Sequence, residues 1–469
     1  MVQQQLFPVG RHPRVSIENL TGSLEVRGWE ENSIAVEAAG ELPEISQEQD
    51  LLTIRGGVGD LTLRIPLGSR FFGGSKAITD LYVRRLSGHV SIEKARDVVL
   101  SEISGGARVS NCAGDLVLEA IQEPVEVLVC GDDLQARRLG VLRVRQGIGG
   151  SARLSELDEV DIDHIGGDLE VRQVRRRCGV GSVGGDCQLE ESAEAELVVG
   201  NVGGDLRVVQ AQRLHAGNVG GDVFIQAVAA AGVELGNVGG DVSGVALAGL
   251  LRLGHVGGDV DLREIGGAVE ASAIGGDLSL AGTFPAGSHT HLRAGGDARI
   301  VLPEQASVKI EAVVGGSVSG VSEPIPDGSA FSLTYGEGEA ILELQVGGDL
   351  SLRVGSAPTT WSLRRPFKHW LWSPAWAQVS EQLGREFAYL GEEFGRLGRE
   401  IGREVTDVVR EMKRQQRYAW HTGKVDFGWP RERERSSEMA EARATVLRMV
   451  AEGRLSPEEA DLLLRGMEN

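Results

Sequence analysis

Aromatic residues, cysteines and long apolar runs are all scarce in this chain of 469 residues. Phe, Trp and Tyr make up only 4% of it, which argues against a compact α/β enzyme. Four cysteines do not suggest the disulfide framework of a secreted domain. No run of about 18 apolar residues occurs, so we expect no transmembrane helix. Residues 1–7 lack the basic flank and apolar stretch of a signal peptide, and we therefore expect a cytoplasmic location.

Catalytic motifs and basic surface charge are scarce as well. The sequence contains no Gly-x-Ser-x-Gly elbow, no phosphate-binding loop and no His-Glu-x-x-His pair, and its nine histidines are scattered. The net charge is -20, and residues 1–360 hold 29 Lys and Arg against 50 Asp and Glu. Nucleic acid demands a basic face, so this acidic body argues against it. We expect neither an enzyme nor a nucleic-acid binder, and no cofactor.

Glycine, in contrast, is abundant, at 66 residues, and much of it lies in a recurring Gly-Gly-Asp triplet. Successive copies from Gly166 to Gly257 are 17 to 19 residues apart, and a degenerate copy at Gly266 halves the next step. Helical solenoid repeats and propeller blades need roughly 33 to 50 residues. The shorter period fits one coil of a β-solenoid. The fold class predicted is an all-β solenoid, a β-helix with coils of about 18 residues, followed by an α-helical C-terminal tail.

Apolar residues keep fixed places in each repeat. One precedes the glycine pair, one follows the Asp, and a third lies further along the coil. Stacked coils would turn these places into rows along a core, and β-branched residues suit such strands. The glycines would supply either a positive φ or a close backbone approach at each corner. The four cysteines follow the same register, which predicts small buried hydrophobic side chains more than a metal site: Cys112, Cys130, Cys178 and Cys187.

Two polar columns accompany the apolar rows. Asn201, Asn218 and Asn237 should stack as an amide ladder. A column of Asp follows the glycine pairs, and carboxylates about 4.8 Å apart repel each other by roughly 1 kcal/mol in a water-like dielectric. Each Asp could accept hydrogen bonds from the N–H groups of its own turn. The alternative is a row of calcium ions, although the match to the calcium-binding nonapeptide fails in detail; the candidates are Asp205, Asp222, Asp241 and Asp259.

The pattern divides the chain into five parts. Residues 1–85 show strand-like alternation, and we expect a β-rich N-terminal cap, a small sandwich being one form of it. Residues 86–356 form the expected solenoid of Gly-Gly-Asp coils. The last three parts are a Trp-rich segment with a long amphipathic helix (357–420), a polar linker (421–436) and a helical hairpin (437–469).

The Trp-rich segment mixes aromatic and basic residues. Six of the seven tryptophans lie beyond residue 357, among them Trp370, Trp372 and Trp376. Such a mixture suits a membrane interface, which would place the protein peripherally at the inner membrane face. It equally suits an aromatic lid over the last coil. Both interpretations stay open at the sequence level.

The helices of the tail expose apolar seams of their own. Phe387 and Phe394 belong to a seam with alternating steps of three and four residues, as in a coiled coil. This helix could pack along the solenoid, self-associate or lie on a lipid surface. Leu447 and Leu463 lie on the apolar faces of the hairpin, which is too small for a full core. A protein partner or self-association through these helices is therefore expected.

The repeat from about Gly88 to Leu352 resembles the bacterial "putative adhesin" β-solenoid family of unknown function, whose coils carry a recurring Ser/Gly-Gly-Asp-Leu/Val turn. The stretch Val446–Ala460 looks like a short helical-hairpin module of the SHOCT type. The resemblance implies no catalytic residues. Where a similar hairpin accompanies the solenoid in relatives, it implies envelope-stress sensing or signalling.

Three functions compete on these grounds. The first is a non-catalytic scaffold or adhesin-like interaction protein whose tail recruits a partner. The second is a self-assembling cytoskeletal polymer that resembles the bactofilins. The third is a carbohydrate-active β-helix enzyme, which would need coil-specific carboxylates on one face, whereas this repeat shows the same polar residues in every coil. The regularity favours the scaffold.

Overall fold

A computed structural model of the protein describes residues 3–38, 43–74, 77–321 and 324–355. The predicted helical tail lies outside these ranges, and so do its candidate interaction residues Trp370, Trp372, Trp376, Phe387, Phe394, Leu447 and Leu463. Within the described ranges, no helix is long and apolar enough to cross a membrane.

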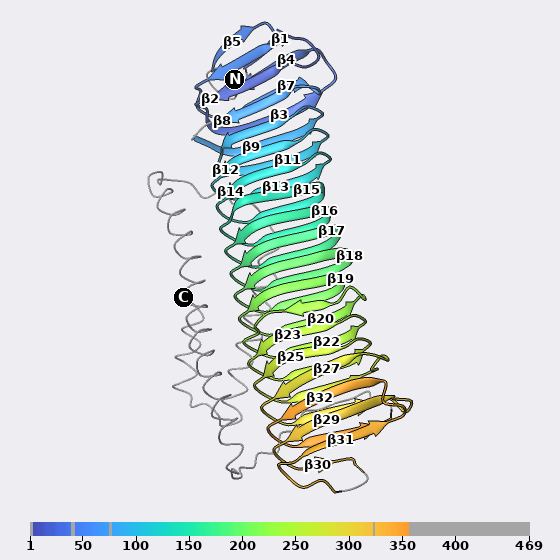
Figure 1. Cartoon of the computed structure of the whole chain (residues 1–469). Coiled ribbons are helices and arrows are strands. Elements are labelled where there is room, and N and C mark those ends of the chain that lie inside the picture. The colour runs from blue at the N-terminus through green and yellow to red at the C-terminus, as the bar shows by residue number, and fades with distance from the viewer. Residues whose placement is uncertain (1–2, 39–42, 75–76, 322–323, 356–469) are drawn as a thin grey trace, which may run out of the picture. The chain divides into compact units, whose positions relative to one another are not determined.

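The described part of the chain is an all-β solenoid of about 13 turns with coils of about 18 residues, as predicted (Figure 1). Each coil contributes to two parallel ladders. One ladder contains the segment that follows the Asp corner, and the other contains the segment that precedes the glycine pair. In β15 to β19 a single strand runs through both ladders, and elsewhere in the stack each segment is a separate strand. We call these the first and the second ladder.

The central stack follows the chain in order. Its strands are β10 (Val90–Lys94), β11 (Asp97–Ile103), β12 (Ala107–Cys112), β13 (Leu116–Ile121), β14 (Val125–Cys130), β15 (Leu134–Ile148), β16 (Ala152–Ile165), β17 (Leu169–Val183), β18 (Cys187–Val202), β19 (Leu206–Val219), β20 (Val223–Val228), β21 (Val233–Leu235), β22 (Val242–Leu247), β23 (Leu251–Val256), β24 (Val260–Ile265), β25 (Val269–Ile274), β26 (Leu278–Gly282), β27 (His289–Ala294) and β28 (Ala298–Leu302). All pairings among them are parallel.

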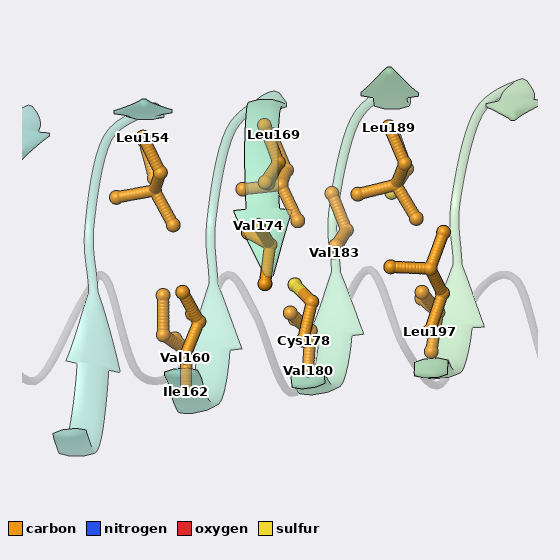
Figure 2. Packing of buried hydrophobic residues seen from close by; sticks show 14 of the residues in the cluster. Leu154, Val160, Ile162, Leu169, Val174, Cys178, Val180, Val183, Leu189 and Leu197 are labelled. Atoms are coloured by element: carbon orange, nitrogen blue, oxygen red, sulfur yellow. The ribbon is translucent and has the colours of Figure 1, made fainter. Parts of the chain in front are cut away.

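The core consists of apolar rows that run along the stack. Side chains from the two ladders point toward one another in successive coils, as Figure 2 shows for Leu154, Val160, Leu189 and Leu197. The three apolar places predicted from the repeat are buried throughout the central stack, which confirms the register. The four cysteines are buried too, and desolvation raises the pKa of Cys178 to about 12.

The N-terminal end departs from sequence order. Its strands are β1 (Gln3–Pro8), β2 (Arg14–Glu18), β3 (Thr21–Trp29), β4 (Ser33–Ala38), β5 (Glu44–Glu48), β6 (Leu51–Arg55), β7 (Leu61–Pro66), β8 (Arg70–Gly74) and β9 (Ala77–Leu86). Strand β2 pairs with both β6 and β8, and β3 pairs with both β7 and β9. The coil of β2 and β3 therefore lies between two coils that follow it in the sequence.

Antiparallel strands close this end. Strand β4 pairs antiparallel with β7, β1 with β4, and β5 with β6. Strands β8 and β9 continue directly into the ladders through β10 and β11, so the N-terminal strands and the central stack form one continuous sheet system.

The C-terminal end repeats this arrangement. Its strands are β29 (Val308–Val314), β30 (Val318–Ser319), β31 (Ala330–Tyr335), β32 (Ala340–Val346) and β33 (Leu350–Val354). Strand β32 pairs with both β27 and β29, and β33 pairs with both β28 and β30, so the last coil in sequence is the penultimate coil in space (Figure 1). Strand β31 adds an antiparallel edge to β29. At both ends, therefore, the coils do not stack in chain order.

Candidate functional site along the Gly-Gly-Asp corner

The first glycine of each corner is required by close contact between coils. A Cβ on Gly203 would lie 2.2 Å from the carbonyl oxygen of Gly184, and one on Gly220 would lie 2.4 Å from that of Gly203. Real Cβ atoms do not approach an oxygen so closely. None of these glycines has a positive φ. Of the two roles considered for the corner glycines, close backbone approach is therefore the one that applies.

The second glycine makes room for the Asp of the preceding coil. A Cβ on Gly221 would lie 2.0 Å from Asp205 Oδ1. That oxygen accepts a 2.8 Å hydrogen bond from the backbone N–H of Asp222. The hydrogen bond goes to the next coil, so the prediction that each Asp serves its own turn is wrong. The same bond joins consecutive corners along the stack, in the spatial order Asp97, Asp115, Asp133, Ser151, Asp168, Asp186, Asp205, Asp222, Asp241, Asp259, Asp277, Asp297, Asp349 and Ser317.

These bonds explain how the column tolerates its own charge. A hydrogen bond to a charged group contributes about 1.5–3 kcal/mol net. The repulsion between exposed carboxylates one strand spacing apart is roughly 1 kcal/mol, and salt screens it further. The hydrogen bonds thus offset the repulsion. The Asp column ties successive coils together, and we call it the corner column.

The calcium candidates Asp205, Asp222, Asp241 and Asp259 all belong to the corner column. Each of them uses Oδ1 to accept the N–H of the next coil. Among the residues that the structure describes, no group of three or more His, Cys, Asp or Glu is placed to hold a metal ion. Calcium binding by the column stays a prediction that requires measurement.

A second corner of the coil carries the positive φ angles, and no glycine occupies it. From Arg85 to Glu264, one non-glycine residue per coil has φ between 52° and 63°, and the pairing register skips it, as at Arg138 and Glu156. The left-handed conformation costs a non-glycine residue about 1–2 kcal/mol. Sequence reasoning missed this column, because its residue types share no pattern: Arg85, Glu102, Ala120, Arg138, Glu156, Gln173, Glu191, Gln210, Ala227, Ala246 and Glu264.

The Asn ladder is confirmed. Asn218 Nδ2 donates to Asn201 Oδ1 at 2.9 Å, and Asn237 Nδ2 donates to Asn218 Oδ1 at 2.9 Å. Nδ1 of His255 extends the column, 3.2 Å from Asn237 Oδ1. Glycines precede these asparagines, and a Cβ on Gly217 would lie 2.1 Å from the carbonyl oxygen of Gly200. The polar side chains here bond to one another along the stack.

Charged side chains on the outer faces also pair between coils. Glu190 lies 3.8 Å from Arg172 and 3.5 Å from Arg207, whose guanidinium stacks 4.5 Å from the ring centroid of Phe224. Hydrogen bonding from Gln188 is the main cause that lowers the pKa of Glu190. Similar exposed pairs recur along the stack, each worth about 0–1 kcal/mol; examples are Arg137–Glu156, Arg145–Asp161, Arg153–Glu170, Arg213–Glu196 and Arg252–Glu270.

The chain was compared with protein families, curated proteins and solved structures. Residues 21–248, a little less than half of the chain, match the sequence model of the family described as Toastrack DUF4097. A crystal structure of a putative cell adhesion protein from Clostridium sporogenes ATCC 15579 was also found, with 11% sequence identity, 76% of this chain and 100% of that chain covered, and a TM-score of 0.12. Alignment at that score carries no argument about fold or function. No curated protein matches the chain. The family match over residues 21–248 thus supports the predicted relation to a β-solenoid family of unknown function.

Proposed function

We propose that this protein is a non-catalytic, adhesin-like interaction scaffold, in which the solenoid is the rigid body and the C-terminal helices recruit a protein partner. The observation that carries the proposal is the corner column. Its repeated carboxylates, the natural candidates for chemistry, are bonded from coil to coil. These carboxylates all make the same kind of hydrogen bond between coils, whereas an active site needs a local set of distinct groups. This uniformity supports a scaffold more than an active site.

The two ends of the solenoid favour a discrete scaffold over a bactofilin-like polymer. End-to-end stacking requires parallel edges at both ends that can continue the ladders. At the N-terminal end β4 and β5 run antiparallel to the stack, and β31 does so at the other end. The outermost strand β1 runs in the direction of the stack, and the antiparallel β4 separates it from the ladders. A coil added at either end would therefore meet an antiparallel strand, β5 or β31. We therefore assign recruitment of a protein partner to side chains outside the stacked coils.

The test uses tagged full-length protein, recovered from its host under native conditions with quantitative mass spectrometry of the proteins that remain bound. We expect Leu447→Asp with Leu463→Asp to remove the enriched partner, because both substitutions place charge on the apolar faces of the predicted hairpin. The matched control is Arg207→Glu with Phe224→Asp on the solenoid face. A partner retained by the hairpin variant and lost from the control variant would overturn the assignment of recruitment to the tail.

Light scattering of the same proteins adds a second readout. If the helices recruit a second copy of the chain, full-length protein will be a defined oligomer that the hairpin variant dissociates. Long, growing assemblies that persist in the hairpin variant would instead support the polymer and contradict the scaffold.

A further inference from the structure

Cys112 and Cys130 face each other in neighbouring coils. They are the last residues of β12 and β14, and these two strands pair in parallel with Cys112 directly opposite Cys130 (Figure 1). Paired strands lie about 4.8 Å apart, and the Cα atoms of disulfide-bonded cysteines lie about 4.4–6.8 Å apart. The backbone thus holds the two cysteines at a separation that a disulfide bond can span.

The two sulfur atoms also approach the same backbone oxygen. Sγ of Cys112 lies 3.6 Å from the carbonyl oxygen of Gly114, and Sγ of Cys130 lies 3.4 Å from that oxygen. Hydrogen bonding with the Cys112 side chain is the main cause that raises the pKa of Cys130, and burial is the second. The two thiols therefore contact each other as well as the backbone of the corner.

The other two cysteines of the chain are arranged differently. Cys178 belongs to the second ladder and Cys187 to the first, and every residue opposite them on a paired strand is Val or Leu. Sheets that face each other across a core lie about 10 Å apart, whereas a disulfide needs Cα atoms within about 7 Å. Cys178 and Cys187 are thus an internal control, equally buried but not in register.

We propose that Cys112 and Cys130 form a reversible disulfide bond that staples two consecutive coils, with a low-molecular-weight disulfide as the oxidant. One cysteine thiolate attacks a sulfur of the oxidant, breaks its S–S bond and releases the first thiol. The second cysteine thiolate then attacks the protein sulfur of this mixed disulfide and releases the second thiol. The two protons of the cysteines pass to the released thiolates. The protein loses two electrons and the oxidant gains two.

Burial controls the rate of this reaction. Cys112 is 1% exposed and Cys130 is 0% exposed, and the nucleophile is the thiolate, which burial disfavours. The corner must therefore open before an oxidant can react. Opening breaks backbone bonds between the two coils, such as the 2.8 Å bond from the Gly131 N–H to the Cys112 carbonyl oxygen. After the corner closes again, the disulfide would link the same two coils covalently.

The staple goes beyond the proposed scaffold function, because it changes how easily the coils separate and not which side chains recruit a partner. It would join the coil of β11 and β12 to the coil of β13 and β14, and so resist separation of the N-terminal coils from the central stack. Partner capture is measured on protein kept reduced with dithiothreitol. Failure of the staple and failure of the scaffold are therefore distinguishable.

Peptide mapping tests the bond and its selectivity in one experiment. Trypsin leaves each pair of cysteines on one peptide, 109–137 or 178–207, because neither stretch contains an internal Lys or Arg. Full-length protein is incubated with oxidised glutathione, quenched in acid, alkylated after denaturation and digested. We expect peptide 109–137 to lose both alkylation sites and two hydrogen atoms, and peptide 178–207 to keep both sites. Dithiothreitol added before alkylation should restore the two sites.

Three outcomes of the mapping would overturn the proposal. The first is that both cysteines of peptide 109–137 stay reduced. The second is that they carry glutathione without a bond between them. The third is equal oxidation of the two peptides, because that would show no dependence on the register of the coils. Cleavage at Glu119, Glu123 and Glu126 separates Cys112 from Cys130 and identifies the bond directly.

Hydrogen exchange of full-length protein tests the staple itself. Oxidation should slow exchange in peptides around 113–131 by at least about tenfold, because a disulfide restricts the opened chain. Cys130→Val should abolish this slowing and still fold, since Val183 occupies the same column further along the stack. Cys187→Val is the matched control and should retain it, and exchange in β16 reports whether each variant stays folded. Slowing that persists in Cys130→Val, or unchanged exchange in the oxidised wild type, would contradict the staple.

Discussion

The substitution Gly220→Ala tests why glycine recurs at the corners of the repeat. It asks whether close contact between coils, rather than an unusual backbone angle, excludes a larger side chain there. The new Cβ would lie 2.4 Å from the carbonyl oxygen of Gly203. Relief of that overlap needs a displacement of about 1 Å, since carbon and oxygen settle more than 3 Å apart. The two neighbouring backbone bonds across this step, from Gly220 N to Val202 O and from Gly221 N to Gly204 O, are 2.9 and 3.0 Å long. A shift of that size would stretch both bonds beyond useful length.

The expected cost follows from these two effects. Overpacking of a close-packed site costs about 1–3 kcal/mol, and each weakened backbone hydrogen bond adds about 0.5–1.5 kcal/mol. With two such bonds, we expect Gly220→Ala to lower the free energy of unfolding by about 2–6 kcal/mol. Gly179→Ala is the matched control in the same stack, because its Cβ would have its nearest neighbour at 3.7 Å. It should be neutral or stabilising by about 0.4–1 kcal/mol through the unfolded chain.

Urea titration of the full-length variants, followed by circular dichroism, measures the difference. Stacked coils can unfold in more than one step, so hydrogen exchange in peptides around 203–221 gives the local stability alongside the global one. Gly220→Ala should expose this region first. Equal stability of Gly220→Ala and Gly179→Ala would refute the steric account of the Gly-Gly corner.

Three further predictions concern the corner column and the core. Asp222→Asn should be more stable than Asp222→Ala by about 1 kcal/mol, because both remove the same charge and only the Asn retains an oxygen that accepts the Asp241 N–H. Urea titration of the two variants measures this difference, and equal free energies of unfolding would contradict the role of the hydrogen bond. Millimolar calcium should shift the melting temperature by less than about 1 °C, while a larger rise that Asp222→Asn abolishes would support the row of calcium ions instead. The free energy of unfolding should fall between about pH 9 and pH 12, because burial raises the pKa of Cys178 to about 12 and the unfolded chain loses this proton first. Burial raises the pKa of Cys187 as well, so Cys178→Val should reduce the slope without abolishing it, and an unchanged slope would contradict the contribution of Cys178.

The repetitive centre of the fold could be predicted from the sequence, because each coil repeats the same physical requirements. The apolar residues beside the glycine pair, such as Val183 and Leu206, recur at a fixed spacing that only a stack of coils satisfies. The Asn ladder followed for the same reason, since identical amides one strand spacing apart bond to each other. The Asp column could be predicted as a column, and only its bonding partner was wrong.

The remaining features leave no periodic trace in the sequence. The left-handed residues Arg138, Glu156 and Gln173 differ in type, because their conformation is imposed by the coil around them. The two inserted coils depend on pairings between segments that are distant in the chain, such as β32 with β27. The local sequence of β32 does not identify β27 as its pairing partner. The apolar row of β31 reads as an ordinary strand, and its partial exposure depends on what lies beside it.

The inserted coils supply the last step of the case for a discrete scaffold. At the C-terminal end, β29 and β30 come earlier in the chain than β32 and β33, yet they lie farther out in the stack. The end can therefore close only when the last strands enter between two coils that precede them. A stack closed in this way has a fixed number of coils and a fixed register, because a further coil would have to displace a strand that is paired on both sides. Capping by insertion thus limits the length of the solenoid through its topology, and a polymer of the same repeat would need the opposite property.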